Sequence, residues 1–135
     1  MTWDPGQYLK YSGERMRPAL DLLARVPLSA ARTIVDLGCG SGNTAQMLGG
    51  RWSQAAITGV DSSEAMLTRA RAGTEGQARY RWQQADIGRW QPDAPVDLVF
   101  SNAAMHWLDD HARLFPRVFA QVAGGGVLAV QMPDN

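Results

Sequence analysis

The sequence predicts an α/β fold in which helices cover both faces of a parallel β-sheet. Short apolar runs rich in Val and Ile alternate with segments of helical periodicity, the pattern of repeated strand–helix–strand units. A glycine-rich segment directly follows the first of these runs, which predicts a ligand loop at the end of a strand. The 135 residues, 45% apolar and 19% charged, suit one globular domain over residues 1–135.

Composition excludes several classes of function. The formal net charge is zero, and twelve Arg and one Lys are scattered without a basic run, so nothing indicates binding to nucleic acid or to an anionic membrane. Cys39 is the one cysteine, which excludes an internal disulfide and favours a cytoplasmic setting. No signal peptide is recognisable, and no apolar stretch approaches membrane-spanning length.

Helices are predicted where apolar residues recur at helical spacing and where caps or breakers bound the segment. Pro27 ends the first helix, the pair Gly49-Gly50 closes the second, and Ser62-Ser63 caps the third, in which Glu64 suits the N-terminus. The triplet Gly124–Gly126 follows the fourth helix and precedes the last strand. The predicted helices are Glu14–Val26, Asn43–Leu48, Glu64–Ala72 and Asp110–Val122.

Strands are predicted at short runs of apolar, β-branched or aromatic residues that end at a polar residue or a turn. The third run is more polar than the others, which favours a sheet edge for it, and the turn Gln91–Pro95 precedes the fourth. The predicted strands are Thr33–Leu37, Ala56–Val60, Tyr80–Ala85, Val96–Phe100 and Val127–Met132.

The glycine loop is the most informative segment for function. Gly38, Gly40 and Gly42 are spaced two apart, whereas a dinucleotide site reads G-x-G-x-x-G, and Asn43 stands where its last glycine would fall. Asp36 precedes the loop, and an acid there disfavours a pyrophosphate and favours a cationic ligand such as S-adenosylmethionine. A phosphate-binding P-loop is excluded because no Gly-Lys-Ser/Thr follows the glycines.

Polar residues also end the other predicted strands. Asp61 lies about 20 residues beyond the loop, the spacing at which an acid binds ribose hydroxyls in either class of nucleotide site. The pair Asp86-Ile87 can accept the adenine amino group and pack against the ring, and Asn102 follows the fourth strand. Because ligands of parallel sheets bind at the carboxyl ends of the strands, these residues form a constellation with the loop.

The segment Val35–Asn43 resembles the first motif of the class I S-adenosylmethionine-dependent methyltransferases, and Asp61, Asp86-Ile87 and Asp97–Asn102 fall where later motifs of that family belong. The resemblance implies a Rossmann-like, doubly wound fold of three layers, with five parallel strands in the order 3-2-1-4-5. It also implies a cofactor site; its members would be Asp36, Gly38, Cys39, Gly40, Gly42, Asn43, Asp61, Ser62, Met66, Asp86, Ile87, Asn102 and Ala103. Met66 at helical spacing fits the core equally well.

The segments that carry a narrower resemblance are Arg17–Ala19, Leu22–Leu28, Ile57–Ser63, His106–Leu108 and Val127–Asn135. In these segments the chain resembles the trans-aconitate methyltransferases within that family, and the resemblance covers nearly all of its length. This implies methyl transfer to a carboxylate of a small polycarboxylic acid, giving a monomethyl ester, with no catalytic base, since such an acid is already ionised at pH 7. It implies no metal. Candidate acceptor residues are Tyr8, Arg15, Arg17, His106 and Trp107. Arginine is suited to bind the remaining carboxylates of the acceptor, because its guanidinium can donate two parallel hydrogen bonds to one carboxylate.

The same resemblance implies two further strands beyond the fifth, so we expect the chain to be carboxy-terminally incomplete, with an unprotected fifth strand that invites self-association. Two alternatives stay open: a cofactor-binding fragment without turnover, and a methyltransferase for another small molecule. A nicotinamide oxidoreductase is disfavoured by the glycine spacing.

Overall fold

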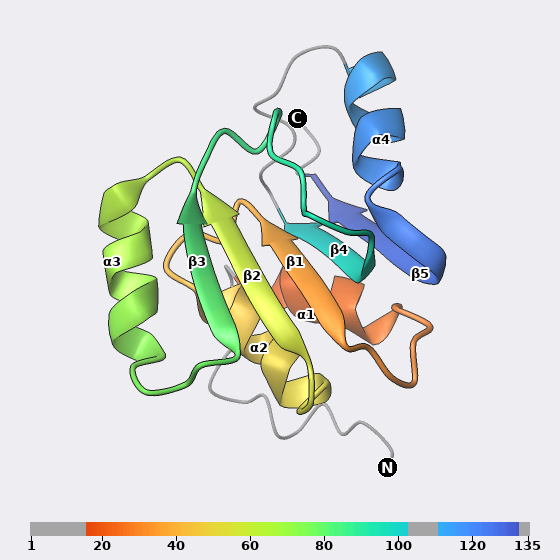
Figure 1. Ribbon diagram of the computed structural model, residues 1–135. Coiled ribbons are helices and arrows are strands. Elements are labelled where there is room, and N and C mark those ends of the chain that lie inside the picture. Colours follow the sequence, from red (N-terminus) through yellow and green to blue (C-terminus); the bar gives the residue numbers. More distant parts are fainter. Residues whose placement is uncertain (1–15, 103–110, 133–135) are drawn as a thin grey trace.

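Five parallel strands form the sheet of this protein, in the order β3-β2-β1-β4-β5 (Figure 1). The computed structural model describes residues 16–102 and 111–132. The strands are β1 (Thr33–Leu37), β2 (Ala56–Asp61), β3 (Tyr80–Gln84), β4 (Val96–Asn102) and β5 (Val122–Gln131). The helices are α1 (Arg17–Ala24), α2 (Asn43–Arg51), α3 (Glu64–Gly73) and α4 (His111–Phe119). The predicted fold class and strand order are confirmed.

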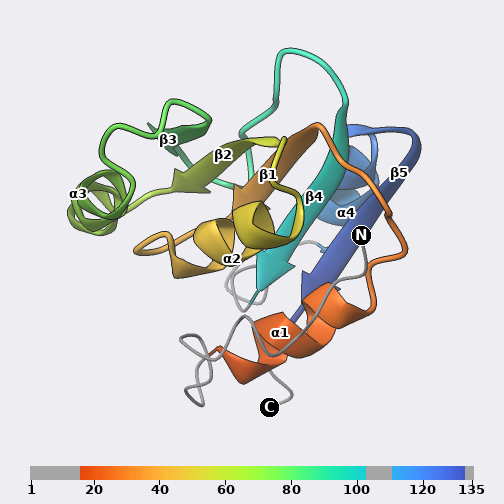
Figure 2. The same cartoon turned by 90° about the horizontal axis from the view of Figure 1, so that it is seen from below.

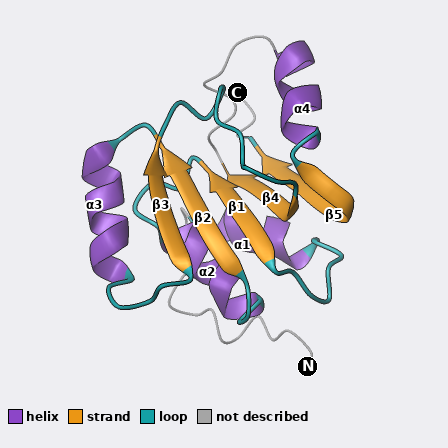
Figure 3. Ribbon diagram, viewed as in Figure 1, coloured by secondary structure: helices purple, strands orange, loops and turns teal. Residues whose placement is uncertain are grey.

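Helices lie on both faces of the sheet, and Figure 2 shows α1 and α2 on one side and α4 on the other. Side chains alternate along β1, so Ile34 joins the core beneath α1 and α2, whereas Val35 and Leu37 join the core beneath α4. α3 packs beside β3 and β2, at the far edge of the sheet (Figure 3). Helices connect β1 to β2, β2 to β3 and β4 to β5, as expected for right-handed crossovers, whereas a loop connects β3 to β4. The carboxyl ends of β1 and β2 share one edge.

The second helix does not end at Gly49-Gly50 as predicted, because α2 continues through both glycines to Arg51. A Cβ on Gly49 would overlap the hydroxyl of Tyr80 and would lie 2.9 Å from its Cζ. The glycine therefore serves the close approach of β3 to α2. Tertiary packing, and not helix termination, explains this residue.

The triplet Gly124–Gly126 is also placed differently from its prediction, since it lies inside β5 and not before it. The register of β4 with β5 shifts between the pairs Val96↔Val122 and Leu98↔Val127, so β5 carries a bulge of three extra residues there. Gly125 has a φ of +82°, and a Cβ on Gly126 would lie 2.6 Å from the carbonyl oxygen of Asp97. The fourth helix ends at Phe119, three residues before the predicted Val122, which is already the first residue of β5.

Two half-buried arginines join helix ends to neighbouring loops. Arg51 donates to the carbonyl oxygens of Leu23, Val26 and Leu28 at 2.5, 2.8 and 3.1 Å. Arg79 donates to those of Gly49, Trp52 and Ala55 at 2.9 to 3.3 Å. These carbonyls lie in or just after the last turns of α1 and α2, where helical partners run out, so each guanidinium acts as a multiple cap. The first helix itself ends at Ala24, two residues before the predicted Val26.

No helix within the described ranges is long and apolar enough to cross a membrane.

Candidate functional site

The glycine loop leaves the carboxyl end of β1 and folds back toward β2. The backbone N–H groups of Gly38 and Cys39 donate to the carbonyl oxygen of Val60 at 2.7 and 3.1 Å. Gly40 and Gly42 have φ of +54° and +91°, in the left-handed region that favours glycine. A Cβ on Gly40 would meet nothing within 4 Å, so this part of the loop faces open space in which a ligand can reach the backbone.

The reverse side of the loop is tightly packed. A Cβ on Gly42 would lie 2.8 Å from Cη2 of Trp82 and 2.9 Å from Cβ of Ala70. Cys39 is buried behind the loop, and burial raises the pKa of its thiol, with the carboxylates of Asp36 and Asp61 adding to the rise. A thiol held protonated is a poor nucleophile, which agrees with a packing role for Cys39.

Asp61 links the loop to the next helix. Its Oδ2 accepts from the N–H of Gly40 at 2.9 Å, and its Oδ1 accepts from the N–H of Ser63 at 2.9 Å. Ser63 in turn caps α3, as the hydroxyl accepts from the N–H of Met66 at 3.3 Å. Each carboxylate oxygen retains a second lone pair, so Asp61 can still accept a hydrogen bond from a ligand hydroxyl.

Asp36 is the buried acid of the site. Its side chain is 1% exposed, on the face of β1 that also carries Ile34, and its Oδ2 has no hydrogen-bond partner. Burial raises the pKa of this carboxyl from 3.8 to about 8, and the charge of Asp61 adds to the effect. A buried acceptor without a donor costs free energy, so a ligand that brings a cationic donor would relieve it.

β4 contributes a second unsatisfied acceptor at the same edge of the sheet. Asp36 is paired with Phe100, so Asn102 lies two residues further toward the carboxyl end. Oδ1 of Asn102 is buried and has no partner. Ser101, which the sequence prediction did not include, is fully buried and donates to the carbonyl oxygen of Leu37 at 2.9 Å. This bond fixes the start of the glycine loop relative to β4.

After β3 the chain forms a turn at Asp86. The carboxylate Oδ1 accepts from the N–H of Gly88 at 2.9 Å, and the carbonyl oxygen accepts from the N–H groups of Arg89 and Trp90. Asp86 is exposed, whereas Ile87 is half-buried against the core under α4. Ser62 is exposed and Met66 is 39% exposed, so Met66 is not a core residue. Asn43 is the exposed first residue of α2.

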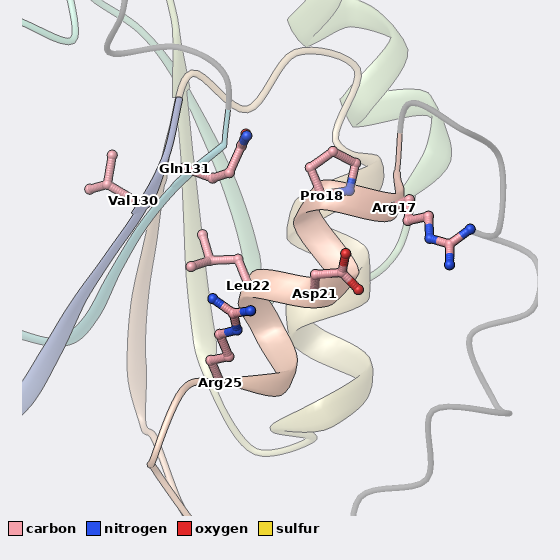
Figure 4. Close-up of a pocket in the computed structure, with 7 residues that line it drawn as sticks. All are labelled: Arg17, Pro18, Asp21, Leu22, Arg25, Val130 and Gln131. Atoms are coloured by element: carbon pink, nitrogen blue, oxygen red, sulfur yellow. The ribbon is translucent and has the colours of Figure 1, made fainter. Parts of the chain in front are cut away.

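Arg17 lines a groove of about 510 Å³ between α1 and the end of β5 (Figure 4). None of the cofactor candidates lines this groove; its residues are Arg17, Pro18, Asp21, Leu22, Arg25, Val130 and Gln131. In Figure 4 the guanidinium of Arg17 points away from β5. Arg25 and Asp21 also line the groove, which the sequence does not predict, because exposed charges at helical spacing indicate only a solvated face.

Five predicted residues lie outside the described part of the chain: Tyr8, Arg15, Ala103, His106 and Trp107. Among residues 16–102 and 111–132, no group of three His, Cys, Asp or Glu side chains could hold a metal ion.

Comparisons with known proteins agree with this geometry. Residues 34–126 match the family described as "Methyltransferase domain". The chain is 55% identical to a trans-aconitate 2-methyltransferase of Azoarcus sp. (strain BH72) over 99% of its own length and 52% of the relative's. It is 49% identical to one from Delftia acidovorans over 100% of its own length and 50% of the relative's. The chain thus spans about half the length of these curated relatives.

Solved structures of methyltransferases share this fold. An S-adenosylmethionine-dependent methyltransferase of Mesorhizobium loti superimposes with a TM-score of 0.77 at 33% identity, over 90% of this chain and 55% of that one. A phosphoethanolamine N-methyltransferase of Haemonchus contortus, in complex with S-adenosyl-L-methionine, superimposes with a TM-score of 0.75 at 27% identity. This match covers 84% of this chain and 27% of that one. By its family match, its relatives and its fold, the chain belongs to the methyltransferase domain family, as its first motif indicates.

Proposed function

We propose that this chain binds S-adenosylmethionine at the carboxyl ends of β1 and β2, and that the protein methylates a carboxylate of a small polycarboxylic acid such as trans-aconitate. One observation carries the cofactor assignment. A glycine loop with an open face is bonded to Asp61 through the N–H of Gly40, and it directly follows the strand that carries the buried, unpartnered Oδ2 of Asp36.

The charges at this site suit a cation better than a phosphate. Two carboxyl groups, Asp36 and Asp61, lie close enough to raise the pKa of Asp36, and one of them already occupies a loop N–H. A pyrophosphate would compete with Asp61 for the loop and would be repelled by it. S-adenosylmethionine carries an ammonium and a sulfonium, so it would be attracted by Asp61 and, once bound, would favour the ionised form of Asp36 by lowering its pKa.

Each candidate residue has a role that follows from its position. Asp36 would meet the ammonium, the backbone of Gly38–Gly42 would lie along the ligand, and Asp61 would accept from the ribose hydroxyls. Ser62, Met66 and the pair Asp86-Ile87 would line the adenine pocket. Asn43 and Asn102 would complete the edge nearest the amino-acid part. The exposure of Met66 and the half-buried Ile87 support this, because adenine needs apolar surface to stack on.

The cofactor supplies an electrophilic methyl on a positive sulfur; a carboxylate oxygen of the acceptor bonds to it while the carbon–sulfur bond breaks and its electron pair stays on sulfur. The acceptor is already an anion at pH 7, so the chain need only hold it in line with the methyl. The relatives named trans-aconitate 2-methyltransferase support this class of acceptor.

The donor is tested by thermal unfolding with S-adenosylhomocysteine, with NADH and without ligand. At a hundredfold excess over Kd a ligand adds about 2.7 kcal/mol of stability, which raises Tm by several degrees in a domain of this size. We expect the rise with S-adenosylhomocysteine alone. A rise with NADH alone would overturn the cofactor assignment in favour of a nicotinamide enzyme.

The acceptor is tested by transfer of a labelled methyl to trans-aconitate and to other di- and tricarboxylic acids, with this chain and with a full-length protein that contains it. Labelled trans-aconitate ester from the full-length protein is expected. Binding without transfer by the 135-residue chain would identify it as a cofactor-binding fragment. Transfer to a different small molecule, with none to trans-aconitate, would overturn the acceptor assignment.

Arg17 is the acceptor candidate that lies in the described part of the chain. We expect Arg17→Ala in the full-length protein to raise the KM for trans-aconitate about tenfold while leaving the Kd for S-adenosylhomocysteine unchanged, because a lost carboxylate–guanidinium pair costs binding of the acceptor alone. The variant Arg25→Ala, in the same groove, is the comparison. An unchanged KM in Arg17→Ala would remove this residue from the acceptor site.

A further inference from the structure

The Asp86–Trp90 turn is held from outside as well as by its own bonds. Within the turn, Asp86 accepts from three backbone N–H groups, and its ion pair with Arg89 is long, at 3.9 Å, and exposed. A short turn with these contacts alone would retain much of its conformational freedom.

The external contacts come from α4 and the residue pair that follows it. Arg117 donates through Nη1 to the carbonyl oxygen of Gly88 and through Nη2 to that of Trp90 at 3.1 Å. Gln121 donates through Nε2 to the same carbonyl of Trp90 at 3.0 Å. Two side chains from one segment thus hold the carbonyls of Gly88 and Trp90, two residues apart in a turn about 30 residues earlier in the chain.

Within the clamp of Arg117 and Gln121, Arg117 is half-buried and Gln121 is buried. Gln121 is 5% exposed, and its own backbone carbonyl accepts from the N–H of Val96 at 2.8 Å, which fixes it to the start of β4. Ile87 and Trp90 pack against the apolar cluster that contains Leu114 and Val118 of α4. The indole N–H of Trp90 donates to Gln83 at 2.6 Å, so the turn is also tied to β3.

We propose that Arg117 and Gln121 are positioning residues of the adenine site, which fix the Asp86–Trp90 turn so that Asp86 and Ile87 stand ready for the base. This inference rests on the proposed binding of S-adenosylmethionine. The inference gives that binding a specific origin for its selectivity. Recognition of the amino group of adenine depends on the rigid turn as well as on the side chains of Asp86 and Ile87 that contact the base.

The choice of arginine at position 117 fits this role. A planar guanidinium can donate two parallel hydrogen bonds to carbonyls in fixed directions, whereas the ammonium of lysine is a point donor on a flexible stem. Without the fork, the turn must be ordered when the ligand binds, and that entropy is subtracted from affinity. The loss falls on the part of the ligand that the turn contacts.

The test compares four variants of the chain by calorimetric titration. Arg117→Met and Gln121→Leu remove the donors at similar side-chain size, Arg117→Lys keeps the charge, and Arg69→Met removes an exposed arginine of α3 as the control. The ligands are S-adenosylhomocysteine and S-inosylhomocysteine, which differ at the amino group of the base. The ratio of their Kd values measures recognition of adenine.

We expect Arg117→Met to bind S-adenosylhomocysteine about tenfold more weakly. The ratio of the two Kd values should fall toward one, because S-inosylhomocysteine loses less. Gln121→Leu and Arg117→Lys should show smaller changes in the same direction, and Arg69→Met none. A merely structural role would weaken both ligands equally and leave the ratio unchanged, and that result would overturn the proposal.

Folding is followed separately by ¹⁹F spectra of protein labelled with fluorotryptophan, with the Trp90 resonance assigned by Trp90→Phe. In Arg117→Met, we expect the Trp90 resonance to broaden or shift while that of Trp52 stays in place. An unchanged Trp90 resonance would show that the turn does not need the clamp and would overturn the proposal. If the unaltered chain does not bind S-adenosylhomocysteine, the proposed function fails, and with it the role of the clamp in that function.

Discussion

At the scale of single residues, Asp36 carries the largest electrostatic cost in the site. Its carboxyl has a pKa of about 8 in the folded chain against 3.8 in the unfolded chain, mainly because it is buried. Between these values the folded chain binds one proton more than the unfolded chain, so raising the pH favours unfolding. The cost is absent below about pH 4 and complete above about pH 8.

We therefore expect the free energy of unfolding of the unaltered chain to fall relative to that of Asp36→Asn as the pH rises from 4 to 8. The slope of this difference should approach about 1.4 kcal/mol per pH unit, which is the linkage of one proton. Urea unfolding of both proteins at five pH values measures it. A difference that does not change with pH would show that Asp36 is ionised in the folded chain throughout.

The two loop glycines Gly40 and Gly42 should separate ligand binding from stability. Gly42→Ala places a Cβ against Trp82 and Ala70 at a φ of +91°, so we expect a loss of more than about 3 kcal/mol of stability. In Gly40→Ala the new methyl has no neighbour within 4 Å, so the main cost to stability is backbone strain of about 1 kcal/mol. That methyl enters the proposed ligand site, so we expect this variant to bind the ligand more weakly.

Urea unfolding and calorimetry with S-adenosylhomocysteine on both variants measure these two effects. A stable Gly40→Ala variant that binds the ligand normally would place the ligand away from this face of the loop.

At the scale of elements, the fit of α2 against β3 outweighs helix propensity. Replacing a helical Gly by Ala ordinarily adds about 1 kcal/mol of stability. We expect Gly49→Ala to lose about 1–2 kcal/mol instead, because the new methyl overlaps the hydroxyl of Tyr80.

A double-mutant cycle with Tyr80→Phe isolates this contact. The same glycine change should cost less in the Tyr80→Phe background, since the overlapping oxygen is gone and the ring carbon at 2.9 Å remains. Equal costs in both backgrounds would mean that the overlap is relieved by movement of the helix.

At the scale of the whole molecule, β5 is an edge strand of the sheet formed by the described residues. Val127, Leu128 and Val130 are half-buried there, although they have the composition of a central strand. Such an edge can pair with a second copy. We expect light scattering on this chain to show a mass that grows with concentration. A constant monomer mass up to the highest soluble concentration would contradict the prediction.

The sequence predicted the fold class and strand order because alternating apolar runs and a glycine loop are local signals that tertiary structure rarely reverses. It also placed Asp36, Asp61 and Asn102 at one edge, since strand ends in a parallel sheet converge. It assigned the wrong roles to Gly49 and Gly126. Both glycines are required by close contacts with residues distant in the chain, Gly49 with the hydroxyl of Tyr80 and Gly126 with the carbonyl of Asp97. The contacts of Arg117 and Ser101 were invisible for the same reason.

The two arginines that cap the ends of α1 and α2, Arg51 and Arg79, restrict which substitutions these two positions can accept. Arg51 and Arg79 each hold three carbonyls, so exchange for lysine would keep the net charge and nearly the same isoelectric point while leaving some carbonyls without donors. Twelve of the thirteen basic residues are arginine. At positions 51 and 79 that preference has a geometric reason, and an arginine-to-lysine change there would be far from conservative.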